Sequence, residues 1–348
     1  MAPYGKSIFE ISTEKLDLEL KHPFTISRGT RKTVQNILVT VRAEGITGMG
    51  EAAPNHRYGE TRESSEHYIQ GLADNLRDQP LDYRELAEYI KCYQEGEFAA
   101  KAGLEMALYD WIGKKEHIPL YKKWMAPGRI GPCTTFTIGI DQPESIRQKV
   151  REAAPYPRLK IKLGSTHDKE IIRTLSEVTD KPLLVDANES WTTLDQAIEM
   201  IRFLEQFNVY IVEQPMPAGC DQEMMRLKKR SAIPLFADES VTGSEPMEKL
   251  VNGFHGINIK LMKTGGLDPS FQLLKKARNA EMKIMVGCML QSAVADTASA
   301  LVALWADYAD IDGHLLVTNN PCKGVSVLQD GTLELPDGAG LGLRQMRV

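Results

Sequence analysis

Hydrophobic and polar residues alternate along the first 52 residues of the chain. Apolar residues recur at every second position over 8–11, 16–20 and 34–41, and again in the run that ends at residue 51. Successive side chains of a strand point to opposite faces of a sheet, so this period of two predicts several half-buried strands. Two polar segments that contain glycine, residues 23–31 and 55–61, separate or follow these strands, and we expect both to be loops.

The pattern then becomes helical, most clearly over residues 99–111, where small residues fall on one side. Strands followed by helices predict an α+β unit over residues 1–125, and the turn-forming sequence Ala126-Pro127-Gly128 marks its end. The tail over residues 316–348 contains a hairpin-like stretch at 324–335, and we expect the tail to return to this first unit.

Residues 126–315 alternate between short β-rich runs and amphipathic helical stretches. The runs repeat at intervals of about 25 residues, the length of a compact strand–helix unit. They lie at residues 135–140, 159–163, 183–187, 210–213, 235–237, 257–261, 283–287 and 308–311. Eight such units predict an α/β fold with a parallel (β/α)8 barrel. A doubly wound open sheet is the alternative, but no Gly-x-Gly-x-x-Gly follows the first run.

Composition narrows the class of protein. The chain has 348 residues, 42% hydrophobic and 26% charged, with a formal net charge of −5. This balance excludes disorder, and the mild acidity argues against nucleic acid as a partner. No apolar run is long enough to span a bilayer, and residues 1–6 lack the apolar core of a signal peptide. The five cysteines have neither metal nor redox spacing, so we expect a cytoplasmic location.

Charged residues recur where the β-rich runs end. Lys160 and Lys162 stand two apart in the second run, so both side chains point to the same face. A single charged residue at such a position is commonly a solvated strand end or a helix cap. Charges of both signs at the ends of six runs favour a shared site instead, because active sites of barrel enzymes lie at the carboxyl ends of the strands.

Three carboxylates end consecutive runs, namely those of Asp186, Glu213 and Asp238. Converging carboxylates repel one another and raise each other's pKa unless a cation lies between them. Oxygen ligands without histidine or cysteine indicate a hard cation, so we expect Mg²⁺, with one ion in each subunit.

Lys162 and Lys260 belong to runs half a turn apart around such a barrel, so we expect them on opposite sides of a substrate held at the metal. A cation beside a carboxylate stabilises the enediolate that forms when the α-proton leaves. The charge of Lys160 would lower the pKa of Lys162 and favour a neutral base. Two lysines on opposite sides of the substrate would invert its stereocentre. If one lysine took no part in proton transfer, the same site could catalyse β-elimination or cycloisomerisation instead.

Several short sequences together identify a family. They are Lys160-Ile161-Lys162, Asp186-Ala187-Asn188, Glu213-Gln214-Pro215, Ala237-Asp238-Glu239-Ser240, the segment 258–266 and the helix at 99–111. With them, the chain resembles the muconate-lactonizing subgroup of the enolase superfamily. The resemblance implies a modified (β/α)7β TIM barrel over residues 126–315, and an N-terminal α+β capping domain over 1–125 that 316–348 completes. It also implies that the three carboxylates bind Mg²⁺.

The resemblance implies roles for the lysines as well. Lys162 and Lys260 would be the catalytic acid and base, and Lys160 would support the enolate and lower the pKa of its neighbour. Lys263 lies near Lys260 in the sequence but falls in the loop between strand and helix, so we prefer Lys260 for the second role.

Asp310-Ile311-Asp312 is similar to the Asp-x-Asp signature with which dipeptide epimerases hold the α-ammonium group of their substrate. Two carboxylates on one strand face, away from the metal, favour a bound cation. The alternative is an acidic rim that caps Lys263 or a helix. At the family's other substrate-contact positions stand Thr137, Lys160, Cys288, Met289 and Leu290.

The loops of the capping domain are expected to meet the side chain of the second substrate residue. Arg28, Arg31 and Arg57 are candidates for a clamp on a carboxylate there. Relatives specific for alanyl-glutamate carry an arginine in the first of these loops, and Arg28 is displaced from that position by one residue. Arginines that are simply exposed at the surface are the alternative.

The sequence therefore predicts an Mg²⁺-dependent dipeptide epimerase that inverts the α-carbon of the C-terminal residue of an L-Ala-Xaa dipeptide. L-Ala-D/L-Glu is the first substrate expected, with murein peptide recycling as its setting. Other reactions of the subgroup are alternatives: N-acylamino acid racemisation, o-succinylbenzoate synthesis and cycloisomerisation. A non-catalytic barrel that binds a small acid is the alternative from another class. The expected partner is a small-molecule dipeptide, without nucleic acid or membrane, and assembly into a homo-oligomer is left open.

Overall fold

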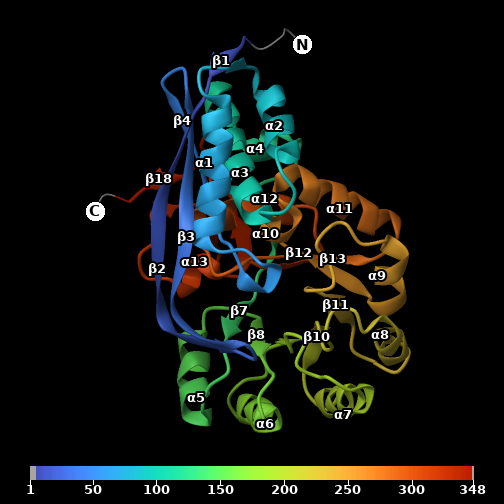
Figure 1. Cartoon of the computed structure of the whole chain (residues 1–348). Coiled ribbons are helices and arrows are strands. Elements are labelled where there is room, and N and C mark those ends of the chain that lie inside the picture. The colour runs from blue at the N-terminus through green and yellow to red at the C-terminus, as the bar shows by residue number, and fades with distance from the viewer. Residues whose placement is uncertain (1–4, 347–348) are drawn as a thin grey trace.

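An antiparallel sheet with its helices stands against a parallel barrel in this chain (Figure 1). The computed structural model describes residues 5–346. Residues 1–4 and 347–348 lie outside the described part. The expectation that residues 1–6 do not belong to a signal peptide therefore falls mostly outside the described residues. Among the described residues, no helix has the length and apolar character needed to cross a membrane.

The predicted alternation forms a three-stranded antiparallel sheet, in the order β2 (Glu10–Ile26), β3 (Gly29–Ala43) and β4 (Ile46–Ala52). The prediction of a loop over residues 23–31 is wrong, because β2 and β3 stay paired almost to their tip. Thr25 faces Thr30, and the two hydroxyl groups lie 2.9 Å apart. Only Ser27 and Arg28 form the turn between the strands.

The far end of this hairpin bends over the barrel near β8, as Figure 1 shows. Ile140 N donates to Thr25 O at 2.9 Å, and Ser27 Oγ donates to Asn188 O at 3.1 Å. The backbones also approach closely at Gly139, where a Cβ atom would lie 3.0 Å from Thr25 O. The polar residues that suggested a free loop therefore dock on the barrel rim.

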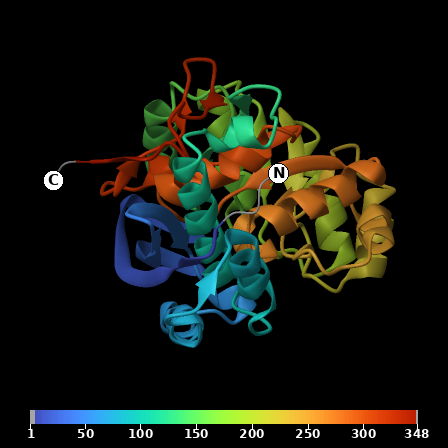
Figure 2. The same ribbon diagram turned by 90° about the horizontal axis from the view of Figure 1, so that it is seen from above.

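Helices cover one face of the sheet, and the longest of them lies between the sheet and the barrel (Figure 2). The elements of this layer are η1 (His56–Tyr58), α1 (Arg62–Leu76), α2 (Tyr83–Cys92), α3 (Phe98–Lys115) and α4 (Leu120–Lys123), and β1 (Ser7–Ile8) pairs with β5 (Pro80–Leu81). Every residue of α3 from Ala99 to Gly113 is buried. A Cβ atom at Gly50 of β4 would lie 2.1 Å from Gly103 O, so only glycine permits this approach. Burial on all sides explains the apolar sequence of α3.

All eight predicted barrel strands are present and form one parallel sheet in chain order. They are β7 (Phe136–Ile138), β8 (Leu159–Lys162), β9 (Leu183–Asp186), β10 (Val209–Glu213), β11 (Leu235–Ala237), β12 (Gly256–Ile259), β13 (Lys283–Gly287) and β14 (Tyr308–Asp310). The helices after the first seven are α5 (Pro143–Glu152), α6 (Asp168–Val178), α7 (Leu194–Leu204), α8 (Asp221–Lys228), α9 (Met247–Gly253), α10 (Leu261–Thr264) with α11 (Leu267–Asn279), and α12 (Ala293–Ala303). In the described part of the chain, the short α13 (Gly313–Leu316) stands after β14 in place of an eighth long barrel helix, which gives the (β/α)7β architecture.

Side chains help to close the barrel between its first and last strands. Thr135 Oγ1 donates to Asp310 Oδ1 at 2.6 Å, and Thr137 N donates to Asp312 Oδ2 at 2.6 Å. Asp310 and Asp312, the two carboxylates expected to bind substrate, thus also link the first and last strands of the barrel.

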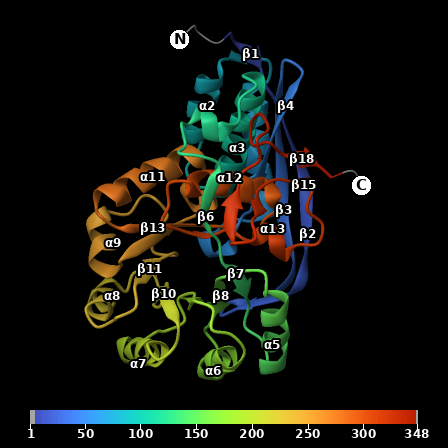
Figure 3. The same ribbon diagram turned by 180° about the vertical axis from the view of Figure 1, so that it is seen from behind.

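The C-terminal tail forms short strands, of which β15 (Cys322–Lys323) and β18 (Arg344–Gln345) lie beside the β2–β3 sheet in Figure 3. Strand β15 pairs with β18, and β16 (Ser326–Val327) and β17 (Thr332–Glu334) form the predicted hairpin. Strand β17 pairs in turn with β6 (Ile130–Cys133), which precedes the barrel. The tail also reaches the helical layer, because Leu341 N donates to Asp110 Oδ1 at 2.8 Å and Leu120 N donates to Gly340 O at 2.9 Å.

Candidate active site

A cavity of about 740 Å³ lies at the carboxyl ends of the barrel strands, beneath the hairpin tip and the segment around η1. Its lining includes the expected catalytic lysines and substrate-contact residues: Arg28, Thr137, Lys160, Lys162, Lys260, Cys288, Met289, Leu290, Asp310 and Asp312. Asp238 lines the cavity too, whereas Asp186 and Glu213 are completely buried behind the lining. The fold therefore brings these residues together from both halves of the chain.

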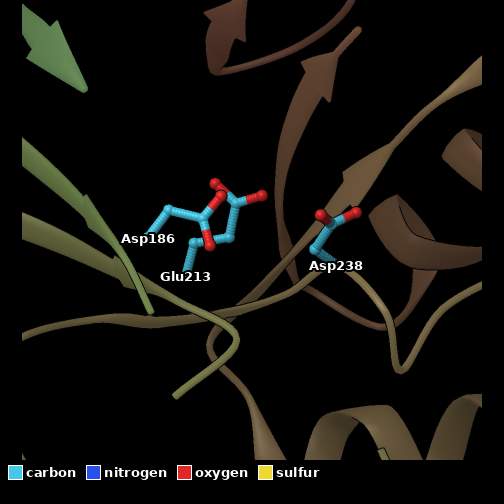
Figure 4. Close-up of side chains that lie close together, drawn as sticks. All are labelled: Asp186, Glu213 and Asp238. Carbon is cyan, nitrogen blue, oxygen red and sulfur yellow. The ribbon is translucent and has the colours of Figure 1, made fainter. Parts of the chain in front are cut away.

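Asp186, Glu213 and Asp238 form a buried acidic cluster at the ends of three neighbouring strands. One carboxylate oxygen of each lies within 4.8 Å of the others. Figure 4 shows the carboxyl groups of Asp186 and Glu213 side by side, with Asp238 across from them. Three hard oxygen donors this close fit a divalent cation such as Mg²⁺.

Two neighbours hold the first two carboxylates of the cluster. Asn258 Nδ2 donates to Glu213 Oε1 at 2.8 Å, and Asn188 N donates to Asp186 Oδ1 at 2.9 Å. Asn188 has a φ of 44°, a strained backbone that a side chain rarely adopts. Sequence reasoning did not single out these roles. Asn258 could have been found, because it stands two residues from Lys260 and so shares its strand face.

Gln214 holds the third carboxylate in place through the backbone. Its Oε1 accepts hydrogen bonds from Asp238 N at 2.9 Å and from Ser240 N at 3.0 Å, and its φ is 36°. The side chain of a residue at the end of β10 therefore shapes the end of β11. The Glu-Gln-Pro sequence was the only signal for this contact.

The pKa values in the cluster reflect burial and the neighbouring charges. Burial and the charge of Asp186 raise the pKa of Glu213 to about 8. Burial opposes ionisation of Asp186 and Asp238 as well, but the lysines beside them hold both pKa values below their usual range. A divalent cation among the three carboxylates would lower the pKa of Glu213 in the same way.

Lys160 and Lys162 point to the same side, as the strand period predicts. Both ammonium groups contact Asp186 Oδ2, Lys160 at 3.0 Å and Lys162 at 2.6 Å. Lys160 also lies 2.7 Å from Glu213 Oε2 and 2.6 Å from Asp310 Oδ2. Although burial opposes its charge, Asp186 and Asp310 raise the pKa of Lys160 well above its usual value.

Lys260 approaches the cluster from the other side of the barrel. It follows β12, four strands from β8 in the eight-stranded sheet, and its Nζ lies 2.8 Å from Asp238 Oδ2. Lys263 on α10 donates to Asp238 Oδ1, Asp238 O and Asn258 O. Of these two lysines, Lys260 lines the cavity and Lys263 does not. This arrangement favours Lys260 as the residue that meets a ligand.

The two aspartates of the Asp-x-Asp sequence differ in their surroundings. Asp310 contacts Lys160, which also contacts Asp186 and Glu213, so Asp310 joins the network around the acidic cluster without being one of its three carboxylates. Asp312 accepts from Thr137 N and its Oδ1 lies 3.9 Å from Cys288 Sγ. Burial and the charge of Asp310 raise the pKa of Asp312 to about 7.

The three candidate arginines all line the cavity, but two of them already have carboxylate partners. Arg28 Nη2 donates to Glu239 Oε1 at 2.8 Å. Arg57 makes two hydrogen bonds to the Glu189 carboxylate, at 2.7 and 2.8 Å. Ion pairs thus join the hairpin tip and the η1 segment to the barrel rim.

Two family models match the chain. Residues 10–123 match the N-terminal domain of the mandelate racemase / muconate lactonizing enzyme family, and residues 144–346 match the enolase C-terminal domain-like family. The two matched regions correspond to the sheet-and-helix unit and to the barrel with its tail.

Similar proteins include epimerases of dipeptides. The L-Ala-D/L-Glu epimerase of Bacteroides thetaiotaomicron is 37% identical over 331 residues, which are 95% of this chain and 86% of that protein. The L-Ala-D/L-amino acid epimerase of Pedosphaera parvula is 37% identical over 340 residues, which are 94% of this chain and 97% of the relative. The crystal structure of the dipeptide epimerase from Cytophaga hutchinsonii, complexed with Mg and D-Ala-L-Val, has a TM-score of 0.91 at 29% identity, and covers 98% of this chain and 96% of its own.

Proposed function

The chain belongs to the mandelate racemase / muconate lactonizing enzyme family of the enolase superfamily, and from this premise we propose that it is an Mg²⁺-dependent dipeptide epimerase. It is an isomerase of the epimerase type, as its named relatives are. The reaction we propose inverts the α-carbon of the C-terminal residue of an L-Ala-Xaa dipeptide. The observation that carries the proposal is the pair of lysines that approach one acidic cluster from opposite sides.

Asp186, Glu213 and Asp238 would hold the Mg²⁺ ion. When bound, the ion supplies positive charge beside the substrate carboxylate and stabilises the enediolate form of the substrate. Its donor set has only oxygen atoms, and all three side chains are buried, which suits a hard cation.

Lys162 would take the α-proton from one epimer, and Lys260 would return a proton to the opposite face of the same carbon. In the reverse direction the two lysines exchange roles. Lys160, whose pKa its carboxylate neighbours raise, supplies positive charge beside Lys162 and stabilises the negative charge that develops on the substrate.

Asp310 and Asp312 would recognise the free α-ammonium group of the dipeptide. Asp312 is buried, lines the cavity and has no lysine or arginine bound to it among the described residues, whereas Asp310 shares Lys160 with Asp186 and Glu213. An N-acylated substrate would leave Asp312 without a cationic partner, so this residue favours dipeptides over N-acylamino acids. The B. thetaiotaomicron relative suggests L-Ala-D/L-Glu as the first dipeptide to try, which would fit the recycling of murein peptides.

Exchange of the α-proton with D₂O tests the two lysines separately. We expect Lys162→Ala and Lys260→Ala each to abolish epimerisation of L-Ala-D/L-Glu. Each variant should still exchange the α-proton of one epimer, and the two should differ in which epimer exchanges, because each retains one base. The measurement is NMR or mass spectrometry of each pure epimer with Mg²⁺ present. Exchange of both epimers by either variant would remove that lysine from the mechanism.

A further inference from the structure

Glu239 is a buried carboxylate with one oxygen that lacks a partner. Its side chain is 1% exposed, although it borders the large cavity. Its Oε1 accepts from Arg28 Nη2 at 2.8 Å and from Asn188 Nδ2 at 3.3 Å. Among the described residues, no donor reaches Glu239 Oε2. A buried polar atom left in this way is costly, so a ligand or water is expected to satisfy it.

Asn188 presents a second acceptor of the same kind. Its Oδ1 is buried and also lacks a hydrogen-bond partner, while its Nδ2 is turned to Glu239. Both residues border the acidic cluster, since Glu239 follows Asp238 and Asn188 N donates to Asp186. Two buried residues, each with an unsatisfied acceptor oxygen, therefore stand next to the carboxylates that we assign to Mg²⁺.

Mg²⁺ favours six oxygen ligands and gives up its water reluctantly, so it normally keeps several water molecules at a protein site. Water bound to a dication is a strong hydrogen-bond donor, and acceptor groups around the metal site commonly bind it. We propose that Glu239 Oε2 and Asn188 Oδ1 accept hydrogen bonds from water that the Mg²⁺ ion carries. The inference rests on the proposed function, in which the ion binds to the three neighbouring carboxylates.

This assignment changes the role of Arg28. Its guanidinium comes from the tip of the β2–β3 hairpin and holds Glu239 Oε1, which leaves Oε2 available to another donor. Arg28 also donates to Asn188 O at 3.2 Å, so it fixes both acceptors. Arg28 is then a positioning residue that links the capping domain to the metal site, rather than a clamp on the side chain of the substrate.

Mg²⁺ affinity measured by isothermal titration calorimetry, without substrate, tests the proposal. Glu239→Gln keeps the size of the side chain and one oxygen for Arg28, but turns an amide donor toward the metal-bound water. We expect the Kd for Mg²⁺ to rise about 10-fold or more, within the range typical of residues that support metal ligands. Arg28→Met should also raise this Kd, because it frees the Glu239 carboxylate to move.

Glu189→Gln is the matched control. Glu189 pairs with Arg57 and contacts Arg28 at 3.3 Å, so its loss weakens the same loops without touching Glu239. We expect its Kd for Mg²⁺ to match that of the wild type. Equal thermal unfolding midpoints in EDTA would show that all variants fold.

The outcomes separate this inference from the proposed function. Wild-type protein that fails to bind Mg²⁺ would overturn both. Normal binding by wild type and by Glu239→Gln would overturn only the role of Glu239. If Arg28 instead bound the side chain of the substrate, Arg28→Met would leave the Kd for Mg²⁺ unchanged. It would also raise KM for L-Ala-L-Glu far more than for the neutral L-Ala-L-Gln. That pair of results would refute the positioning role.

Discussion

At the scale of single residues, the environment decides what a side chain can do. Asp310 and Asp312 belong to one Asp-x-Asp sequence, yet Lys160 lowers the pKa of Asp310 against the effect of burial, and within residues 5–346 no lysine or arginine pairs with Asp312. The groups facing Asp312 are Asp310, Asp296 and the Cys288 thiol, and Thr137 N is its hydrogen-bond donor. The two carboxylates therefore titrate in different pH ranges.

The pKa of Asp312, about 7 in the free protein, predicts a pH-dependent activity. Only the ionised carboxylate attracts the α-ammonium group, so kcat/KM for L-Ala-L-Glu should rise about 10-fold between roughly pH 6 and pH 8 at saturating Mg²⁺. Asp312→Asn should lower kcat/KM and remove this rise. The measurement is a pH profile of kcat/KM for both proteins. A rise that persists unchanged in Asp312→Asn would assign it to another group.

At the scale of elements, carboxyl groups of two glutamates in the first unit cap helices of the barrel. Glu51 of β4 accepts from Ser292 N at 3.0 Å and Ala295 N at 3.3 Å, at the start of α12. Glu105 of α3 accepts from the backbone N–H groups of Leu267 and Asp268, at the start of α11. Helix N-termini carry unsatisfied N–H groups and partial positive charge, so these contacts join the two units through α11 and α12.

Glu105 should make stability depend on pH. Burial and the charge of Asp268 raise its pKa to about 8, whereas a glutamate in the unfolded chain has a pKa of about 4.3. The folded state therefore binds the proton more tightly, and the free energy of unfolding falls as pH rises between these values. Relative to Glu105→Gln, the wild type should lose up to about 1.4 kcal/mol per pH unit in this window, the limit for one proton.

Thermal unfolding midpoints of wild type and Glu105→Gln, measured at intervals across that pH range, test this slope. Glu85→Gln is a suitable control, because Glu85 is exposed on α2 and its pKa is lowered. A constant difference between wild type and Glu105→Gln at every pH would mean that Glu105 stays ionised in the folded protein.

At the scale of the whole molecule, the site is assembled from both units. Strands of the barrel supply the acidic cluster and lysines, while the hairpin tip and the η1 segment cover them and form ion pairs with Glu239 and Glu189. Because α3 packs on both the sheet and the barrel, the units share one hydrophobic core. Unfolding of one unit would expose the buried surface of the other.

We therefore expect a single thermal transition that Mg²⁺ moves upward. A ligand that binds only the folded state stabilises it by about 2.7 kcal/mol at 100 times its Kd, which corresponds to several degrees for a protein of this size. Calorimetric scans in EDTA and in excess Mg²⁺ measure the shift, and Asp238→Asn should lose most of it. Two separate transitions, with only one sensitive to Mg²⁺, would show that the units unfold independently.

The sequence by itself predicted the eight barrel strands, most of the antiparallel sheet, the helix at 99–111 and the three carboxylates of the acidic cluster with the lysines beside them. These features depend on the spacing of apolar residues and on the residue types at the strand ends. Both can be read from short stretches of the sequence. The Asp-x-Asp sequence and the arginines were also visible, because their residue types stand at strand ends or in loops near them.

Only the tertiary structure decided which groups meet. Arg28 and Glu239 are 211 positions apart, and no local pattern indicates that they pair. The same holds for Lys160 with Asp310, and for the hairpin tip, whose polar residues have the composition of a loop but pair in a ladder and dock on the barrel. Burial and the distance between charges fix these pKa values and partners, and both arise only when segments far apart in the chain pack together.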